Sequence, residues 1–292
     1  MVTASSLRVV KPGKWPPTVF STVLLFREAL YGALVIALAC SVLGVYVVLR
    51  RIVFVGAALA QISSAGIALA LWLAGVGIAL GPVTEPTAVS LLLTLGAVMF
   101  FASGARGRVP PDATIGVTYA VAAAVGILLI AKAATGEAHD IFLSGNILGI
   151  TRRDTLVLLG VTLPVLAVHA VFYKELLFVS FDRETARTLG YNVRWWDLLL
   201  YLTLGVVIAS AMQFAGVMLV FNFLVLPAVT GLLLSRTMRG VFFWSVASAL
   251  VAAFVGFSLS VPFDLPSGPA ISAASGAFVL LAWGARRTIT RS

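Results

Sequence analysis

Charged residues are scarce in this chain of 292 residues, which is 11% charged and 61% hydrophobic. Soluble domains carry about 25% charged residues, so this composition excludes an ordinary soluble protein and indicates a polytopic membrane protein. The single cysteine, Cys40, lies in an apolar run and cannot form an intrachain disulfide. The phosphate-binding sequence G-x-x-x-x-G-K-[ST] is also absent, which excludes ATP hydrolysis by a P-loop in this chain.

Long apolar runs fill most of the sequence. A helix that crosses a bilayer needs about 20 mostly apolar residues. Nine runs meet or approach this length: 30–49, 54–76, 87–104, 113–134, 154–173, 197–213, 216–234, 241–261 and 270–285. The stretch 197–234 is too long for one crossing, and "MQFAG" (212–216) offers a break. The sequence therefore predicts an all-α transmembrane bundle of eight or nine spans.

Basic residues are distributed unevenly between the two sets of loops. One set carries thirteen of them: Arg50, Arg51, Arg106, Arg108, Lys174, Arg183, Arg187, Arg194, Arg236, Arg239, Arg286, Arg287 and Arg291. The opposite set carries seven: Arg8, Lys11, Lys14, Arg27, Lys132, Arg152 and Arg153. The positive-inside rule assigns the first set to the cytoplasm, which puts the N-terminus outside and the C-terminus inside. We expect Arg50 and Arg51 to anchor a cytoplasmic turn.

The domain organisation follows from these runs. Residues 1–29 form a polar tail and a short apolar piece, which we expect to be an interfacial helix. No short apolar region there ends at a small-residue cleavage site, so we expect no cleaved signal peptide. Residues 30–292 form one transmembrane domain. Within it, "IFLSGNILGI" (141–150) is too short to span and suggests a re-entrant or interfacial helix.

One long cytoplasmic loop, residues 174–196, contains a local helix with the sequence "DRETARTLG" (182–190). Asp182 or Ser180 can cap its start, and Gly190 can end it. Trp195 and Trp196 lie where the chain re-enters the membrane, as interfacial aromatic residues do. Such a helix can lie on lipid headgroups or can bind a cytoplasmic partner. The residues alone leave both interpretations open.

Four stretches together resemble a known family. They are "GVYVVLRRIVFVGAALAQ" (44–61), "FLSGNILGITRRDTL" (142–156), "FDRETARTLGYNVRWWDLLLYLTLGVVIASAMQFAGVMLVFNFLVLPAVTGLLL" (181–234) and "DLPSGPAI" (264–271). In this order and spacing the chain resembles the membrane subunits of zinc, manganese and iron ABC importers, the family-3 type of ABC permease. The resemblance extends from about Phe26 to Trp283.

This resemblance implies a multi-pass subunit of a bacterial or archaeal cytoplasmic membrane, and not an enzyme. Two copies would pair with two cytoplasmic ATPase subunits and receive substrate from an extracytoplasmic binding protein. The chain itself would bind no cofactor, since the partner uses the ATP, and no nucleic acid. The loop helix would be the coupling helix that docks on the ATPase. Its residues would be Phe181, Asp182, Arg183, Ala186, Arg187, Leu189 and Gly190.

The sequence departs from the family at the positions associated with metal. After the double arginine the family has an Asp and a His four residues apart, where this chain has Ala57 and Gln61. A further acidic position is Asn146, and a histidine of the fourth span aligns near Ala120. Imidazole and carboxylate bind zinc and manganese well, whereas a neutral amide oxygen is a weak ligand.

Polar residues inside the spans still mark a candidate path, because such groups usually face the bundle interior or a cavity. The candidates that line it are Ala57, Gln61, Ser64, Asn146, Gln213 and Asn222. Interhelical hydrogen bonding is the alternative role of the amides. His139 and Asp140 form a weak candidate metal site outside the membrane. His169 is expected to be a hydrogen-bonded structural residue.

Import of a divalent metal, zinc or manganese, is the function that the resemblance implies. The missing Asp and His leave open the same architecture with a metal chelate or another small solute as cargo. A secondary transporter is a third possibility, but it usually needs intramembrane acids, and the predicted spans hold none in their interiors. A membrane scaffold without transport would leave the loop helix unexplained.

Overall fold

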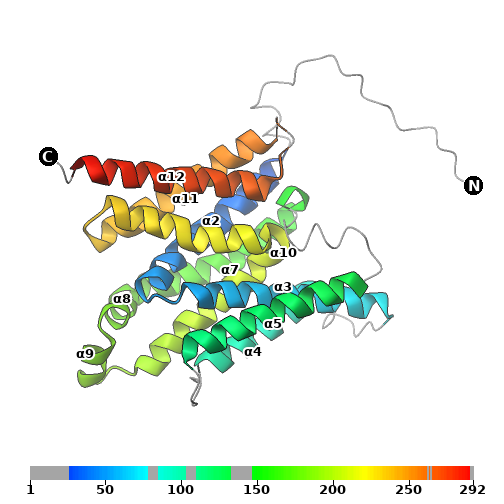
Figure 1. The fold of residues 1–292 in the computed structure, drawn as a ribbon, viewed down its shortest axis with the longest axis horizontal. Coiled ribbons are helices and arrows are strands. Elements are labelled where there is room, and N and C mark those ends of the chain that lie inside the picture. Colours follow the sequence, from blue (N-terminus) through cyan, green and yellow to red (C-terminus); the bar gives the residue numbers. More distant parts are fainter. Residues whose placement is uncertain are drawn as a thin grey trace, which may run out of the picture.

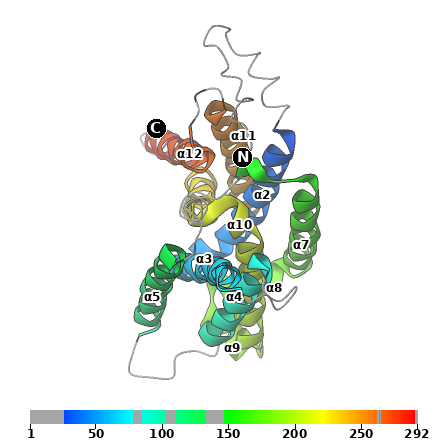
Figure 2. The same cartoon turned by 90° about the vertical axis from the view of Figure 1, so that its right-hand side faces the viewer.

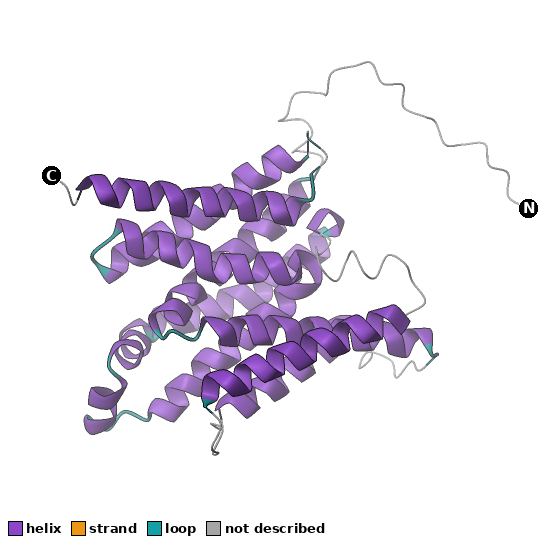
Figure 3. Ribbon diagram, viewed as in Figure 1, coloured by secondary structure: helices purple, strands orange, loops and turns teal. Residues whose placement is uncertain are grey.

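The computed structural model describes residues 26–77, 85–102, 110–132, 147–261, 263 and 265–289. Within these ranges the regular structure is helical and includes no strand (Figure 3). The helices are α2 (Arg27–Leu49), α3 (Val53–Gly75), α4 (Pro86–Ala102), α5 (Pro111–Lys132), the short 3-10 helix η2 (Ile147–Gly149), α7 (Arg152–Val171), α8 (Tyr173–Phe181), α9 (Arg183–Thr188), α10 (Val193–Leu234), α11 (Met238–Ser260) and α12 (Ser267–Ile289).

Seven of the described helices are long and apolar enough to cross a membrane, and α4 is a shorter apolar helix. The seven include α10, which has 42 residues and bends at Gly216. The backbone of Gly216 has φ 70° and ψ 167°, a region that is essentially open to glycine alone. Figure 1 shows the first limb of α10 leaving the end of the bundle that holds α9, and the second limb returning to it. The predicted break at 212–216 is therefore confirmed, and each of the nine predicted segments is mainly helical within the described residues.

The ends of the bundle separate the basic loops as the sequence predicts. Figure 1 places the α2–α3 turn, α9, the α10–α11 connection and the end of α12 at one end. Arg27 and Arg152 lie together at the opposite end, where they line one cavity. The positive-inside rule thus assigns the end with α9 to the cytoplasm.

The helices differ in how deeply they are buried. In Figure 2, where many of the helices are seen nearly end-on, α3 and α10 lie near the middle, and α5, α7 and α12 lie at the outside. The most apolar windows of α2 and α3 are each 67% buried, against 17% for that of α5. The row Gly56, Ala60 and Ser64 on α3 is buried, as its small side chains predict.

Close backbone contacts hold the central helices together. A Cβ atom added at Gly44 of α2 would overlap the backbone carbonyl of Leu224 in α10. A Cβ atom added at Gly66 of α3 would lie 2.6 Å from the Cα atom of Ser90 in α4. The hydroxyls of Ser63 and Ser90 also hydrogen-bond across this contact at 2.7 Å. Small residues thus let these helices approach closely, as they do in membrane bundles generally.

The expectation for residues 1–29 changes at the end of that segment. Arg27, Glu28 and Ala29 belong to α2 and not to an interfacial helix, because the helical hydrogen bonds already begin with Leu30 donating to the carbonyl of Phe26. The remainder of the expected interfacial helix, residues 1–25, lies outside the described residues. The segment 141–150, expected to be a re-entrant or interfacial helix, is described only from Ile147. Ile147 of η2 and Ile150, which follows η2, are buried in the core.

Candidate functional site

The loop helix forms where the sequence predicts it. The Asp182 carboxylate caps α9, accepting from the Thr185 amide at 2.9 Å and from the Thr185 hydroxyl at 2.6 Å. These hydrogen bonds hold the pKa of the Asp182 carboxyl below its ordinary value. Gly190, with φ 84°, follows the helix in the left-handed conformation that favours glycine, and the amide of Tyr191 donates to the carbonyl of Ala186.

One face of the loop helix is buried against the rest of the protein, and the other face is exposed. Ala186 is fully buried and packs with Val179 and Val193. Phe181, the last residue of α8, and Leu189, which follows α9, are by contrast 58% and 65% exposed. The exposed guanidinium of Arg187 forms an ion pair with Glu184 at 3.6 Å. The outer face therefore presents apolar side chains and a positive charge away from the bundle.

Ser180, the second predicted cap, has a different role. Its hydroxyl donates to the carbonyl of Leu176 and accepts from the Nε atom of Arg50 at 2.8 Å. Arg50 also binds the carboxylate of Asp197, with 2.6 Å between Nη1 and Oδ1. The side chains of Arg50 and Asp197 are only 7% and 14% exposed. Burial lowers the pKa of the Arg50 guanidinium, and the Asp197 carboxylate opposes that shift.

The two arginines of the expected cytoplasmic turn differ in where their side chains lie. Arg51 is exposed, with φ 58°, whereas Arg50 points into the protein. The sequence does not predict this ion pair, because Asp197 lies 147 positions from Arg50 along the chain. The position of Asp197 at the start of an apolar run does indicate that its carboxylate has a charged partner, because an unpaired charge there is costly.

The candidate path residues do not gather at one point. A cavity of about 490 Å³ lies between α3, α5 and the second limb of α10, and among the candidates it is lined by Ala57 alone. Its other lining residues are almost all apolar: Phe54, Ile115, Gly116, Tyr119, Val217, Met218 and Phe221. Gln61 lies one helical turn beyond Ala57 on α3, and its buried side-chain oxygen has no hydrogen-bond partner.

The other candidates divide into two groups. Ser64 is 1% exposed and Asn222 is 7% exposed, and the side-chain nitrogen of Asn222 has no partner. Gln213 accepts a hydrogen bond from the Thr87 hydroxyl at 2.5 Å, which is the interhelical role expected as the alternative. Asn146, His139 and Asp140 lie outside the described residues.

Histidine and acidic residues form no metal cluster in the described ranges, where no group of three or more His, Cys, Asp or Glu side chains could hold an ion. His169 is 2% exposed, and its Nε2 atom lies 3.0 Å from the Thr203 hydroxyl. Its ring also packs 5.0 Å from that of Tyr46. The predicted hydrogen bonding of His169 is therefore confirmed at Nε2, whereas its buried Nδ1 atom has no partner among the described residues.

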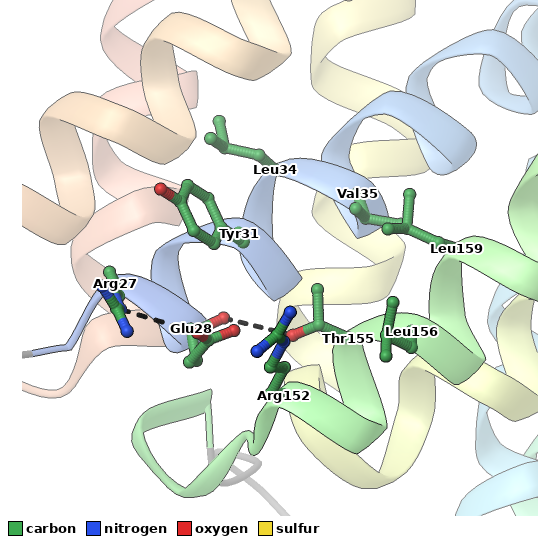
Figure 4. Close-up of a pocket in the computed structure, with 9 residues that line it drawn as sticks. All are labelled: Arg27, Glu28, Tyr31, Leu34, Val35, Arg152, Thr155, Leu156 and Leu159. Carbon is green, nitrogen blue, oxygen red and sulfur yellow. Dashed lines mark hydrogen bonds and ion pairs between the residues drawn. The ribbon is translucent and has the colours of Figure 1, made fainter.

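A second cavity, of about 570 Å³, lies between α2 and α7 at the end of the bundle opposite α9 (Figure 4). Its rim carries Arg27, Glu28 and Arg152, with Arg27 and Glu28 paired at 3.6 Å. Tyr31 and aliphatic side chains form the walls. None of the candidate path residues lines this cavity.

Known proteins resemble this chain over nearly its whole length. The model of the ABC 3 transport family matches residues 23–285. The manganese import system permease protein ScaB of Streptococcus gordonii is 30% identical over 259 residues, which cover 88% of this chain and 90% of that protein. A probable iron transport system membrane protein of Haemophilus influenzae is 27% identical, covering 88% and 92%.

Solved structures share the fold. PsaBC from Streptococcus pneumoniae, in complex with Fab, superimposes with a TM-score of 0.79 at 25% identity, covering 91% of this chain and 94% of that one. A putative metal-chelate type ABC transporter in an inward-facing conformation gives a TM-score of 0.74 at 14% identity, which supports the fold alone. The chain therefore belongs to the ABC 3 transport family, as a multi-pass permease subunit of the cytoplasmic membrane.

Proposed function

We propose that the protein is the permease of an importer that moves manganese into the cytoplasm. Two copies would form the membrane path, two separate ATPase subunits would supply the energy, and an extracytoplasmic binding protein would deliver the ion. The observation that carries this proposal is the likeness to manganese permeases over 88% of the chain.

Docking of the ATPase is assigned to α9 and the residues beside it. Phe181 and Leu189 expose apolar surface at the cytoplasmic end of the bundle, on either side of α9. Arg187 adds a positive charge to the same helix. Apolar anchors ringed by charge are typical of protein interfaces, and this favours the docking interpretation over a helix that lies on headgroups.

Manganese, more than zinc, fits the chemistry of the proposed path. The candidate polar atoms on α3 and α10 are amide and hydroxyl groups, and the side-chain oxygen of Gln61 is buried without a partner. Carbonyl-type oxygens suit manganese, whereas zinc prefers nitrogen and sulfur ligands. Weak ligands in a path also let the ion leave again, which transport requires.

Proteoliposomes that contain the permease with its cognate ATPase and binding protein test the cargo. We expect uptake of Mn²⁺ that requires ATP on the side of the membrane where the ATPase subunits lie. This uptake should exceed the uptake of Zn²⁺. Uptake of neither free ion, together with uptake of a metal chelate, would contradict the proposal and support the chelate as cargo.

A separate experiment tests docking. The double variant Phe181→Asp, Leu189→Asp should lose the ATPase during purification, because it buries two charges in an apolar contact. Phe263→Asp is the matched control, since Phe263 is 68% exposed and lies in the connection between α11 and α12 at the opposite end. Retention of the ATPase by the double variant would show that α9 is not the docking helix.

A further inference from the structure

Asp197 binds two arginines that come from different parts of the chain. Its Oδ1 atom accepts from Arg50, the residue that directly follows α2. Its Oδ2 atom accepts from Arg183, the first residue of α9. One carboxylate at the start of α10 therefore joins the loop helix to the end of a transmembrane helix.

The two halves of this bridge differ in exposure. Arg50 is 7% exposed and is held additionally by Ser180 of α8, whereas Arg183 is 51% exposed. A buried ion pair resists separation, because removal of one partner leaves a lone charge in a medium of low polarity. The ion pair between Asp197 and Arg50 is thus the one that resists separation, and the ion pair between Asp197 and Arg183 faces the cytoplasm.

The two ion pairs of Asp197 link the loop helix to the α2–α3 turn, and no direct connection along the chain joins these two parts. Along the chain, α8 and α9 connect only to α7 and α10, and not to α2 or α3. Figure 1 shows α8 beside the region where α2 ends and α3 begins. Arg50 belongs to the turn of three residues between these helices, which is tight, since the Ile52 amide donates to the Val47 carbonyl at 3.0 Å. A shift of Arg50 therefore shifts the start of α3.

The start of α3 leads directly to the proposed path. The helix begins at Val53, and Ala57 and Gln61 follow at intervals of four residues, about one turn each. We propose that Asp197 is a positioning residue that couples the loop helix to α3, so that movement of α9 on the ATPase reaches the path through Arg50. This inference rests on the proposed docking role of α9.

Loss of the Asp197 charge tests the inference. In Asp197→Asn the freed Arg50 would be a lone buried charge, and the protein could fail to fold. The double variant Arg50→Gln, Asp197→Asn removes both charges and avoids this cost. We expect it to purify with the ATPase and to hydrolyse ATP, while the ratio of Mn²⁺ transported to ATP hydrolysed falls about tenfold, within the usual range of coupling between sites.

Two further variants complete the test. Asp197→Glu keeps the carboxylate and should restore most of the transport-to-hydrolysis ratio. Arg194→Gln removes an exposed charge three residues away on α10 and should leave the ratio unchanged. A wild-type ratio in the double variant would overturn the inference. Failure of the docking role would instead appear as retention of the ATPase by Phe181→Asp, Leu189→Asp, so the two failures are distinguishable.

Discussion

The hydroxyl of Thr87 donates to the side-chain oxygen of Gln213 at 2.5 Å, although the two residues are 126 positions apart. This hydrogen bond joins the first turn of α4 to the first limb of α10 shortly before Gly216. Hydrogen bonds between transmembrane helices contribute about 0.6 kcal/mol on average, and a partly buried acceptor left without its donor costs more.

Thr87→Val should therefore destabilise the protein by about 1 kcal/mol, because it removes the hydrogen-bond donor. Valine keeps the shape of the threonine side chain, so the change isolates the loss of this hydrogen bond. Thermal unfolding in detergent measures the change. Thr118→Val is the matched control, since its hydroxyl bonds only within α5, to the Thr114 carbonyl at 2.8 Å. Equal melting temperatures for the two variants would show that the bond to Gln213 contributes nothing.

Gly216→Ala should destabilise the protein by about 2 kcal/mol, because a residue with a Cβ atom is strained at the backbone angles of this position, φ 70° and ψ 167°. The same measurement of thermal unfolding applies. Gly160→Ala in α7 provides the comparison, since a Cβ atom there meets nothing within 4 Å and alanine favours the helix. If both alanine variants were equally stable, the bend in α10 would not depend on glycine.

The double variant Ala57→Asp, Gln61→His tests whether the path follows this face of α3. A carboxylate and an imidazole one turn apart would bind a passing ion more tightly, so Mn²⁺ and Zn²⁺ should stimulate ATP hydrolysis at lower concentration. Ile67→His adds an imidazole elsewhere on the same helix and should not have this effect. Identical stimulation of the double variant and the wild type would place the path elsewhere.

The cap of α9 should depend on pH through Asp182. Its pKa is lowered in the folded protein, so its contribution to α9 is complete above the ordinary aspartate pKa of about 3.9 and is lost as the pH falls through the lowered value. Amide hydrogen exchange in α9, corrected for the intrinsic rate, should accelerate only in that acidic range. Asp182→Asn should abolish the pH dependence, and its persistence in this variant would assign it to another group.

The sequence predicts those parts of the fold that depend on local patterns. The lengths of the apolar runs predict the spans, because the bilayer sets the length of a crossing. The stretch "MQFAG" predicts the bend, because glycine permits the turn. Asp182 and Gly190 were predicted as the ends of the loop helix because capping depends on neighbours in sequence. The structure confirms these features.

Contacts between distant residues could not be predicted in the same way. Nothing local to Arg50 shows that its partner is Asp197, and nothing local to Gln213 shows that its oxygen faces Thr87. Both contacts depend on how α10 folds back against its neighbours. The position of a polar residue in a span indicates that it faces inward, but its partner is determined by packing.

The close approach at Gly44 has a consequence for how the permease can change shape. Gly44 brings the backbone of α2 against α10 at Leu224, and Gly256 brings that of α11 against α12 at Ile271. Such contacts leave no side chain between the two backbones that could deform, so each of these pairs of helices resists separation. The pair α3 and α4, in contact at Gly66, is packed in the same way.

The chain passes from the pair α2 and α10 to the pair α3 and α4 at the turn that contains Arg50. Between the first limb of α10 and α4 the contacts are made by side chains, such as Val98 against Gly205, and these can shift at lower cost. Movement between these two pairs would therefore hinge along this softer contact. The ion pair between Arg50 and Asp197 lies at the turn that joins them, where a small displacement produces the largest swing at the far end of the path.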